Sequence, residues 1–139
     1  MTSRSPVQPV VLYVGDPIAF AHEDWARFQQ QFKIMSHEYT KPEETISAFK
    51  PGGKYESIQA IVRPSNPAAE RDIGPFTKEL IAHLPPSLKI ISSVNHGYEK
   101  EDTEELGRKG ILYCNGAGGG ESSFYSLFAL RAQLLKKSV

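Results

Sequence analysis

The stretch 88-LKIISSVNHGYEKEDTEELGRKGILYCN-115 decides the fold of this chain. Residues 88–94 are an apolar run with the length and composition of a strand that is buried on both faces. Residues 99–109 are polar and favour a helix, which Gly110 ends as glycine does at a C′ position. A second apolar run follows at residues 111–114. Strand, crossover helix and strand in this order form a βαβ unit, so the two strands are predicted to be parallel.

The same alternation extends over the rest of the chain. Further strands are predicted at residues 7–14, 33–39 and 57–62, and further helices at residues 20–32, 40–50, 77–83 and 121–137. Thr40 is the expected N-cap of the second of these helices, with Pro42 in its first turn. This alternation predicts an α/β three-layer sandwich with a parallel five-stranded sheet, flavodoxin-like in outline.

The composition is that of one ordinary globular domain, predicted to span residues 1–139. A hydrophobic fraction of 40% is enough for a core, and a net charge of +0 gives no sign of a nucleic-acid partner. The single cysteine, Cys114, excludes an intrachain disulfide and is expected to be a buried small hydrophobe. No apolar run has the length of a membrane span and no signal-peptide pattern precedes the first strand, so a cytoplasmic location is expected.

The candidate site residues follow the strands, because ligands of parallel sheets bind beyond the carboxyl ends of the strands. Asn95 and His96 come directly after the strand at residues 88–94 and are the predicted catalytic residues. A neutral imidazole there could act as a general base or donate a hydrogen bond to a carbonyl, with Asn95 as a second polar partner. The alternatives are a solvent-facing loop histidine and an asparagine that only forms the turn.

Other residues at the same sheet edge are predicted to bind substrate. Arg63 follows the strand at residues 57–62 and could pair with a carboxylate through two hydrogen bonds, the alternative being a surface salt bridge. Tyr98 is a candidate hydroxyl partner or a packing residue, and Asp16 a polar partner or a turn residue. The other histidines have no metal-ligand spacing, so no metal site is predicted.

An ordered set of positions in this region forms a family pattern: Gly97, Tyr98, Asp102, Leu106, Gly110, Ile111 and Asn115. With the upstream segment "IQAIVRPSN", it resembles the D-isomer-specific 2-hydroxyacid dehydrogenases, above all their fungal glyoxylate/hydroxypyruvate reductase-like members. The resemblance is close over residues 57–121 and loose over residues 10–50. It implies that the chain is the substrate-binding, so-called catalytic, domain of that family, where the backbone amides of the loop that contains Gly97 approach a substrate carboxylate.

In that family, the nicotinamide cofactor lies on a second, Rossmann-type domain, which also supplies the catalytic histidine and the substrate-binding arginine. The resemblance implies that this chain is truncated after its final helix, before such a domain would begin. No G-x-G-x-x-G motif is present and the glycine run at residues 116–120 is too short to hold a dinucleotide, so no cofactor is expected. The chain also departs from the family pattern, with Asn95 and His96 where Gly and Ala are usual, and Glu101 where an apolar residue is common.

Three functions stay open at this point. The first is a repurposed substrate domain that binds a carbonyl- or carboxylate-bearing small molecule and catalyses a cofactor-free, redox-neutral step. That step would be an isomerisation, elimination or cyclisation, for example in fungal secondary metabolism, and would use Asn95, His96 and Arg63. The second is an inactive fragment or subunit of an NAD(P)-dependent 2-hydroxyacid or glyoxylate reductase, and the third is a non-catalytic binding module.

The final helix suggests self-association. Its apolar stripe includes Phe124 and Phe128, and an apolar patch formed by Tyr125, Leu130 and the flank of this stripe would be covered by the cofactor domain in the family. Without that cover, a homodimer through the helix between Glu121 and Lys137 is expected. The alternative is a monomer in which the helix packs back on its own sheet.

Overall fold

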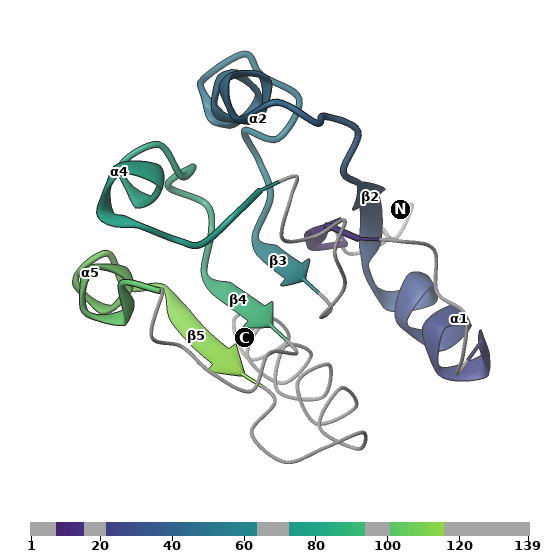
Figure 1. The fold of residues 1–139 in the computed structure, drawn as a ribbon. Coiled ribbons are helices and arrows are strands. Elements are labelled where there is room, and N and C mark those ends of the chain that lie inside the picture. Colours follow the sequence, from purple (N-terminus) through teal and green to yellow (C-terminus); the bar gives the residue numbers. More distant parts are fainter. Residues whose placement is uncertain (1–7, 16–21, 64–72, 94–100, 116–139) are drawn as a thin grey trace, which may run out of the picture.

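The computed structural model describes residues 8–15, 22–63, 73–93 and 101–115. These residues form a five-stranded sheet of order β2-β1-β3-β4-β5, in which all neighbouring strands are parallel (Figure 1). The strands are β1 Val10–Tyr13, β2 Lys33–Ser36, β3 Ala60–Arg63, β4 Ile90–Ser93 and β5 Leu112–Asn115. The strand order 2-1-3-4-5 is the flavodoxin-like one. The predicted fold class is therefore confirmed.

The described helices lie on both faces of the sheet. They are α1 His22–Gln31, α2 Pro42–Phe49, α4 Lys78–Ile81 and α5 Thr103–Arg108. In Figure 1, α2, α4 and α5 lie on one side of the sheet and α1 on the other. Parallel strands need such crossover helices, and the crossovers put helices on the sheet faces, which completes a three-layer arrangement.

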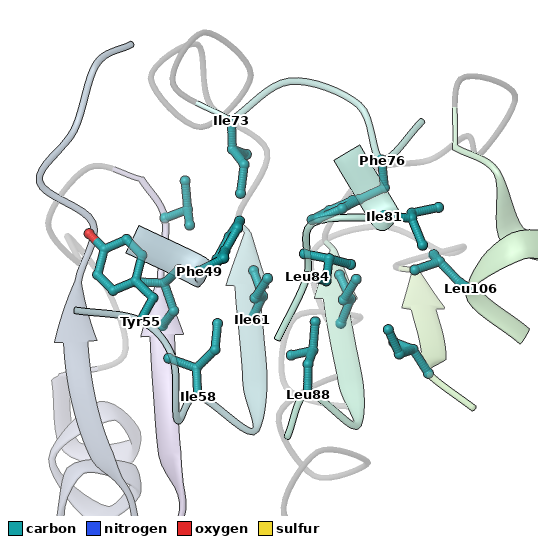
Figure 2. Close-up of a cluster of buried hydrophobic side chains, with 14 of the residues drawn as sticks. Phe49, Tyr55, Ile58, Ile61, Ile73, Phe76, Ile81, Leu84, Leu88 and Leu106 are labelled. Atoms are coloured by element: carbon teal, nitrogen blue, oxygen red, sulfur yellow. The ribbon is translucent and has the colours of Figure 1, made fainter. Parts of the chain in front are cut away.

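The alternation of side chains along each strand divides the core in two. Leu12, Ile61 and Ile91 belong to the larger cluster, beneath α2, α4 and α5. Figure 2 shows this cluster, with Phe76, Ile81 and Leu106 on one side and Phe49, Tyr55 and Ile58 on the other. The intervening strand residues Val11, Val62 and Ile90 pack in the smaller cluster with α1. Because the strands are apolar on both faces, neither layer of helices can be removed without exposing a core.

Helix α1 packs through one aromatic face. The Trp25 and Phe28 rings are 5.6 Å apart and the Phe28 and Phe32 rings 4.6 Å apart, as their spacing of three and four residues predicts. Tyr13 of β1 contacts Trp25 at 5.2 Å between ring centroids. This stack fixes the helix on the sheet.

Several predicted boundaries and burial states were wrong. Strands β1 to β4 are shorter than predicted, and β5 has the predicted length but is shifted by one residue. At residue 88, for example, the amide donates to the Pro85 carbonyl as part of a turn rather than to a neighbouring strand. The N-cap of α2 is Lys41 rather than Thr40, with extended backbone and no side-chain cap bond, because Pro42 occupies the first turn and keeps the preceding residue out of the helix. Cys114 is half-buried rather than buried, and burial raises the pKa of its thiol.

The predicted helix after β4 begins and ends at clear signals. The Asp102 carboxylate accepts a hydrogen bond of 3.0 Å from the Glu105 amide at its N-terminus. Gly110, just past its C-terminus, has φ of +75°, the left-handed conformation that glycine adopts without strain. The predicted glycine turn at residues 116–120 and final helix at residues 121–137 lie outside the described residues.

Candidate functional site

The carboxyl ends of the strands meet at one edge of the sheet, as the predicted site requires. Arg63 at the end of β3 is in register with Ser93 at the end of β4, and Ser93 with Asn115 at the end of β5. Tyr13 of β1 pairs with Val62 of β3 at the same edge. The segments that follow β1, β3 and β4 therefore begin side by side. This is the edge at which ligands of open α/β sheets bind.

Of the predicted site residues, Arg63 alone lies in the part of the chain that the structure describes. Asp16 falls in the undescribed segment 16–21. Asn95, His96, Gly97 and Tyr98 fall in the segment 94–100, which directly follows β4. Their roles stay predictions, although their starting point beside Arg63 and Ser93 is fixed by the strand register.

Arg63 is buried and uses its guanidinium inside the fold. Its side chain is 2% exposed, and its Cζ lies 4.9 Å from the centre of the Phe76 ring. Nη1 donates to the Gly74 carbonyl at 2.6 Å, and Nη2 donates to the Ser93 hydroxyl at 3.4 Å and forms an ion pair with Glu101. The alternative that Arg63 forms a salt bridge at the surface was therefore wrong, because its guanidinium lies in the interior.

Glu101 is the partner that the sequence analysis did not assign. Its side chain is 5% exposed; one carboxylate oxygen accepts from Arg63 and the other from the backbone N–H of Phe76. The Asp102 amide adds a 2.8 Å hydrogen bond to the Phe76 carbonyl. The start of α5 is thus joined to the segment that leads into α4. The sequence did contain a signal for this pair. Glu101 occupies a position where the family commonly has an apolar residue, and a carboxylate that is buried at such a position needs a positively charged partner.

We call Arg63, Gly74, Phe76, Ser93 and Glu101 the Arg63–Glu101 cluster. Tyr113 of β5 lies next to it: burial raises the pKa of Tyr113, while the nearby Ser93 hydroxyl and Arg63 guanidinium oppose that shift. Despite this proximity, the Tyr113 hydroxyl forms no hydrogen bond of good geometry among the described residues, and neither does Nε of Arg63. The cluster pairs its charges well, but within the described ranges these two buried donors have no well-formed hydrogen bond.

Two other kinds of site find no support in the described ranges. No group of His, Cys, Asp and Glu side chains there is arranged to hold a metal ion. None of the helices in those ranges has the length and apolarity needed to cross a bilayer.

A parallel sheet of order 2-1-3-4-5 defines an open α/β fold, and proteins of this class bind their ligands at the carboxyl edge of the sheet. The family model described as "D-isomer specific 2-hydroxyacid dehydrogenase, catalytic domain" matches residues 11–124. The chain belongs to this family. The family resemblance that was based on the sequence around residues 88–115 is thereby confirmed.

Two fungal relatives illustrate the match. The chain is 30% identical over 103 residues to 4-methyl-2-oxopentanoate reductase A of Aspergillus oryzae, covering 74% of this chain and 30% of that protein. It is 26% identical over 110 residues to glyoxylate reductase 1 of Saccharomyces cerevisiae, covering 78% of this chain and 31% of that protein. The chain therefore spans about a third of the length of these relatives.

The solved structures agree. The holo form of Rhodotorula graminis D-mandelate dehydrogenase superposes with a TM-score of 0.73 at 27% identity, covering 83% of this chain and 33% of that one. A glyoxylate reductase from Paecilomyes thermophila superposes with a TM-score of 0.69 at 27% identity, covering 81% of this chain and 33% of that one. Both share the fold described above.

Proposed function

We propose that this chain is the substrate-binding part of a 2-hydroxyacid dehydrogenase-type reductase, and that it binds a small 2-oxo or 2-hydroxy acid at the carboxyl edge of the sheet. The family match over residues 11–124 carries this proposal. Glyoxylate and 4-methyl-2-oxopentanoate, named in the two fungal relatives, are both 2-oxo acids. A carboxylate next to a carbonyl is therefore the chemistry to expect of the ligand.

The sequence assigns the contacts. The backbone amide of Gly97 would donate to the ligand carboxylate, and Asn95 and His96 would donate to its carbonyl or hydroxyl. Tyr98 and Asp16 are the further candidate contacts. The strand register supports this assignment because it starts the segment that contains most of these residues beside the end of β3.

The residues of this chain do not fit a dinucleotide. Such a cofactor needs a glycine-rich turn between a strand and the N-terminus of its helix, so that the backbone can approach the pyrophosphate. β3 ends instead in Arg63, whose guanidinium bonds to Gly74 and Glu101. The 139 residues also contain no G-x-G-x-x-G motif. We therefore assign substrate binding, and no hydride transfer, to these residues.

A binding experiment tests the proposal. Titration of the chain with glyoxylate and with 4-methyl-2-oxopentanoate, followed by calorimetry and amide chemical shifts, should give saturable binding. The matched control ligand is 4-methylpentanoate, which has the same carbon skeleton and carboxylate without the 2-oxo group. Equal binding of both acids, or no binding of either, would contradict a 2-oxo acid site.

Two histidine variants test whether His96 contacts the ligand. His96→Ala should weaken binding about tenfold or more, because a hydrogen bond to a charged or strongly polar ligand group is lost. His83→Ala removes an exposed histidine near the end of α4 and should leave the affinity unchanged. Equal effects of the two substitutions would remove His96 from the site.

The redox-neutral step that the sequence analysis placed first has no comparable support, since the relatives named above are reductases by name. Two further experiments on the same protein distinguish substrate binding alone from a redox-neutral reaction. NADH and NADPH titrations should show no saturable binding, and incubation with either 2-oxo acid should return it unchanged. Conversion of the acid without added cofactor would favour the isomerase, lyase or cyclase reading instead.

A further inference from the structure

The Arg63–Glu101 cluster flanks two of the segments that leave the candidate edge, residues 64–72 after β3 and residues 94–100 after β4. Arg63 precedes residues 64–72, and Gly74 and Phe76 come shortly after them. Ser93 precedes residues 94–100 and Glu101 follows them. The buried ion pair and its hydrogen bonds therefore connect the residues that flank segment 64–72 with the residues that flank segment 94–100.

We propose that Arg63 and Glu101 are positioning residues, which set the geometry of both segments for the ligand without touching it. This inference rests on the proposed function for its effect on binding. It replaces the expectation that Arg63 pairs with the substrate carboxylate, because Nη1 and Nη2 are both bonded within the chain. A carboxylate of the protein already neutralises the guanidinium.

The chemistry of the pair fits this role. A planar guanidinium can donate to the Gly74 carbonyl, the Ser93 hydroxyl and the Glu101 carboxylate in one fixed geometry, which a lysine ammonium on a flexible stem cannot reproduce. Glu101 uses one oxygen for Arg63 and the other for the Phe76 amide, so its position depends on the end of β3 and on the segment that leads into α4. Burial of both side chains protects these bonds from competition with water.

Amide hydrogen exchange tests the positioning role directly. Glu101→Gln keeps the shape of the side chain and an acceptor for the Phe76 amide, but removes the negative charge from Arg63. Exchange in residues 64–72 and in residues 94–100 should rise together, by about tenfold or more. Glu105→Gln is the matched control, since Glu105 lies four residues further along the chain, in α5, and pairs instead with the exposed Arg108. A rise in one segment only, or equal effects of both variants, would overturn the proposal.

A double variant separates positioning from stability. Arg63→Met combined with Glu101→Gln removes both buried charges, so it should recover much of the melting temperature that either single change loses. Exchange in both segments should nevertheless stay raised, and the affinity for the 2-oxo acid should stay reduced about tenfold or more. Recovery of affinity together with stability would show that the pair only stabilises the fold. If the double variant does not fold, the comparison of Glu101→Gln with Glu105→Gln still decides.

The two proposals can fail separately. If the unaltered chain binds neither 2-oxo acid, the proposed function fails, while the exchange data still show whether the pair joins the two segments. If the chain binds and the exchange of both segments is unaffected by Glu101→Gln, the function stands and the positioning role falls.

Discussion

At the scale of single residues, Arg63 shows the limit of reading a site from sequence. Its place after a buried strand predicted an arginine at the strand end, which is present, and a substrate carboxylate as its partner, whereas the partner in the structure is the buried Glu101 of the chain itself. The identity of the partner was not predictable, because Glu101 lies 38 residues away and no local spacing relates the two. The pairing arises only when the parallel register brings the ends of β3 and β4 together and the chain before α5 returns to them at Glu101.

Tyr113 offers a test of buried polar atoms and of alkaline stability. Burial raises its pKa, so the unfolded chain loses the phenol proton first, and the free energy of unfolding should fall as the pH rises past about 10. Tyr113→Phe removes this contribution and should lose less stability above that pH than the unaltered chain. At neutral pH it should change the stability by less than about 1 kcal/mol, because the hydroxyl has no well-formed hydrogen bond among the described residues. Thermal melts from pH 7 to pH 11 measure both effects.

Tyr55→Phe is the comparison for that experiment. The Tyr55 hydroxyl accepts a hydrogen bond of 3.1 Å from the Glu38 amide, and burial raises the pKa of this tyrosine too. Its loss should therefore cost about 1 kcal/mol at neutral pH as well as flatten the alkaline decline. A cost of more than about 2 kcal/mol for Tyr113→Phe at neutral pH would mean that its hydroxyl has a strong partner.

At the scale of elements, the existence, type and order of all described strands and helices could be predicted, but most of their ends could not. The start of β2 at Lys33 and the helix end before Gly110 are exceptions. Periodic apolar segments and turn residues indicate an element, because one face of it must be buried. They do not say where a ladder of hydrogen bonds begins: the amide of Ile58, for instance, is fully buried in the core yet donates within a turn to the Tyr55 carbonyl. Burial and strand pairing are separate properties, and sequence reports mainly the first.

Helix α5 provides a matched pair of glycine substitutions. A methyl group added at Gly107 or at Gly110 would meet no atom within 4 Å, so steric clash plays no part at either position. Gly107 lies within the helix, and Gly107→Ala should stabilise by about 0.5–1 kcal/mol. Gly110 has φ of +75°, and Gly110→Ala should destabilise by about 1–2 kcal/mol.

Denaturant unfolding of the two variants gives the measurement. Because the substitution and the solvent exposure of the new methyl group are the same, the sign of the difference reports the backbone conformation alone. Destabilisation by both variants would indicate that α5 ends before Gly107.

At the scale of the whole molecule, self-association through residues 121–137 remains a prediction. We expect sedimentation of the chain to show a dimer at micromolar concentrations, and Leu130→Glu to shift it to a monomer by placing a charge in the apolar patch beside the stripe. Leu112→Glu is the control, since Leu112 is 45% exposed on the edge strand β5 and should not affect a dimer formed by the final helix. A monomer in both cases would favour a helix that packs on its own sheet.

The buried pairing of Arg63 with Glu101 has a consequence for how this family can change over time. Losing either partner alone strands the other as an isolated charge in the interior, and such losses cost about 3–5 kcal/mol. Substitutions at these two positions should therefore be inherited jointly. Homologues that have an apolar side chain at the position of Glu101 are expected to lack the arginine at the position of Arg63 as well. A sequence alignment of the family would reveal that covariation.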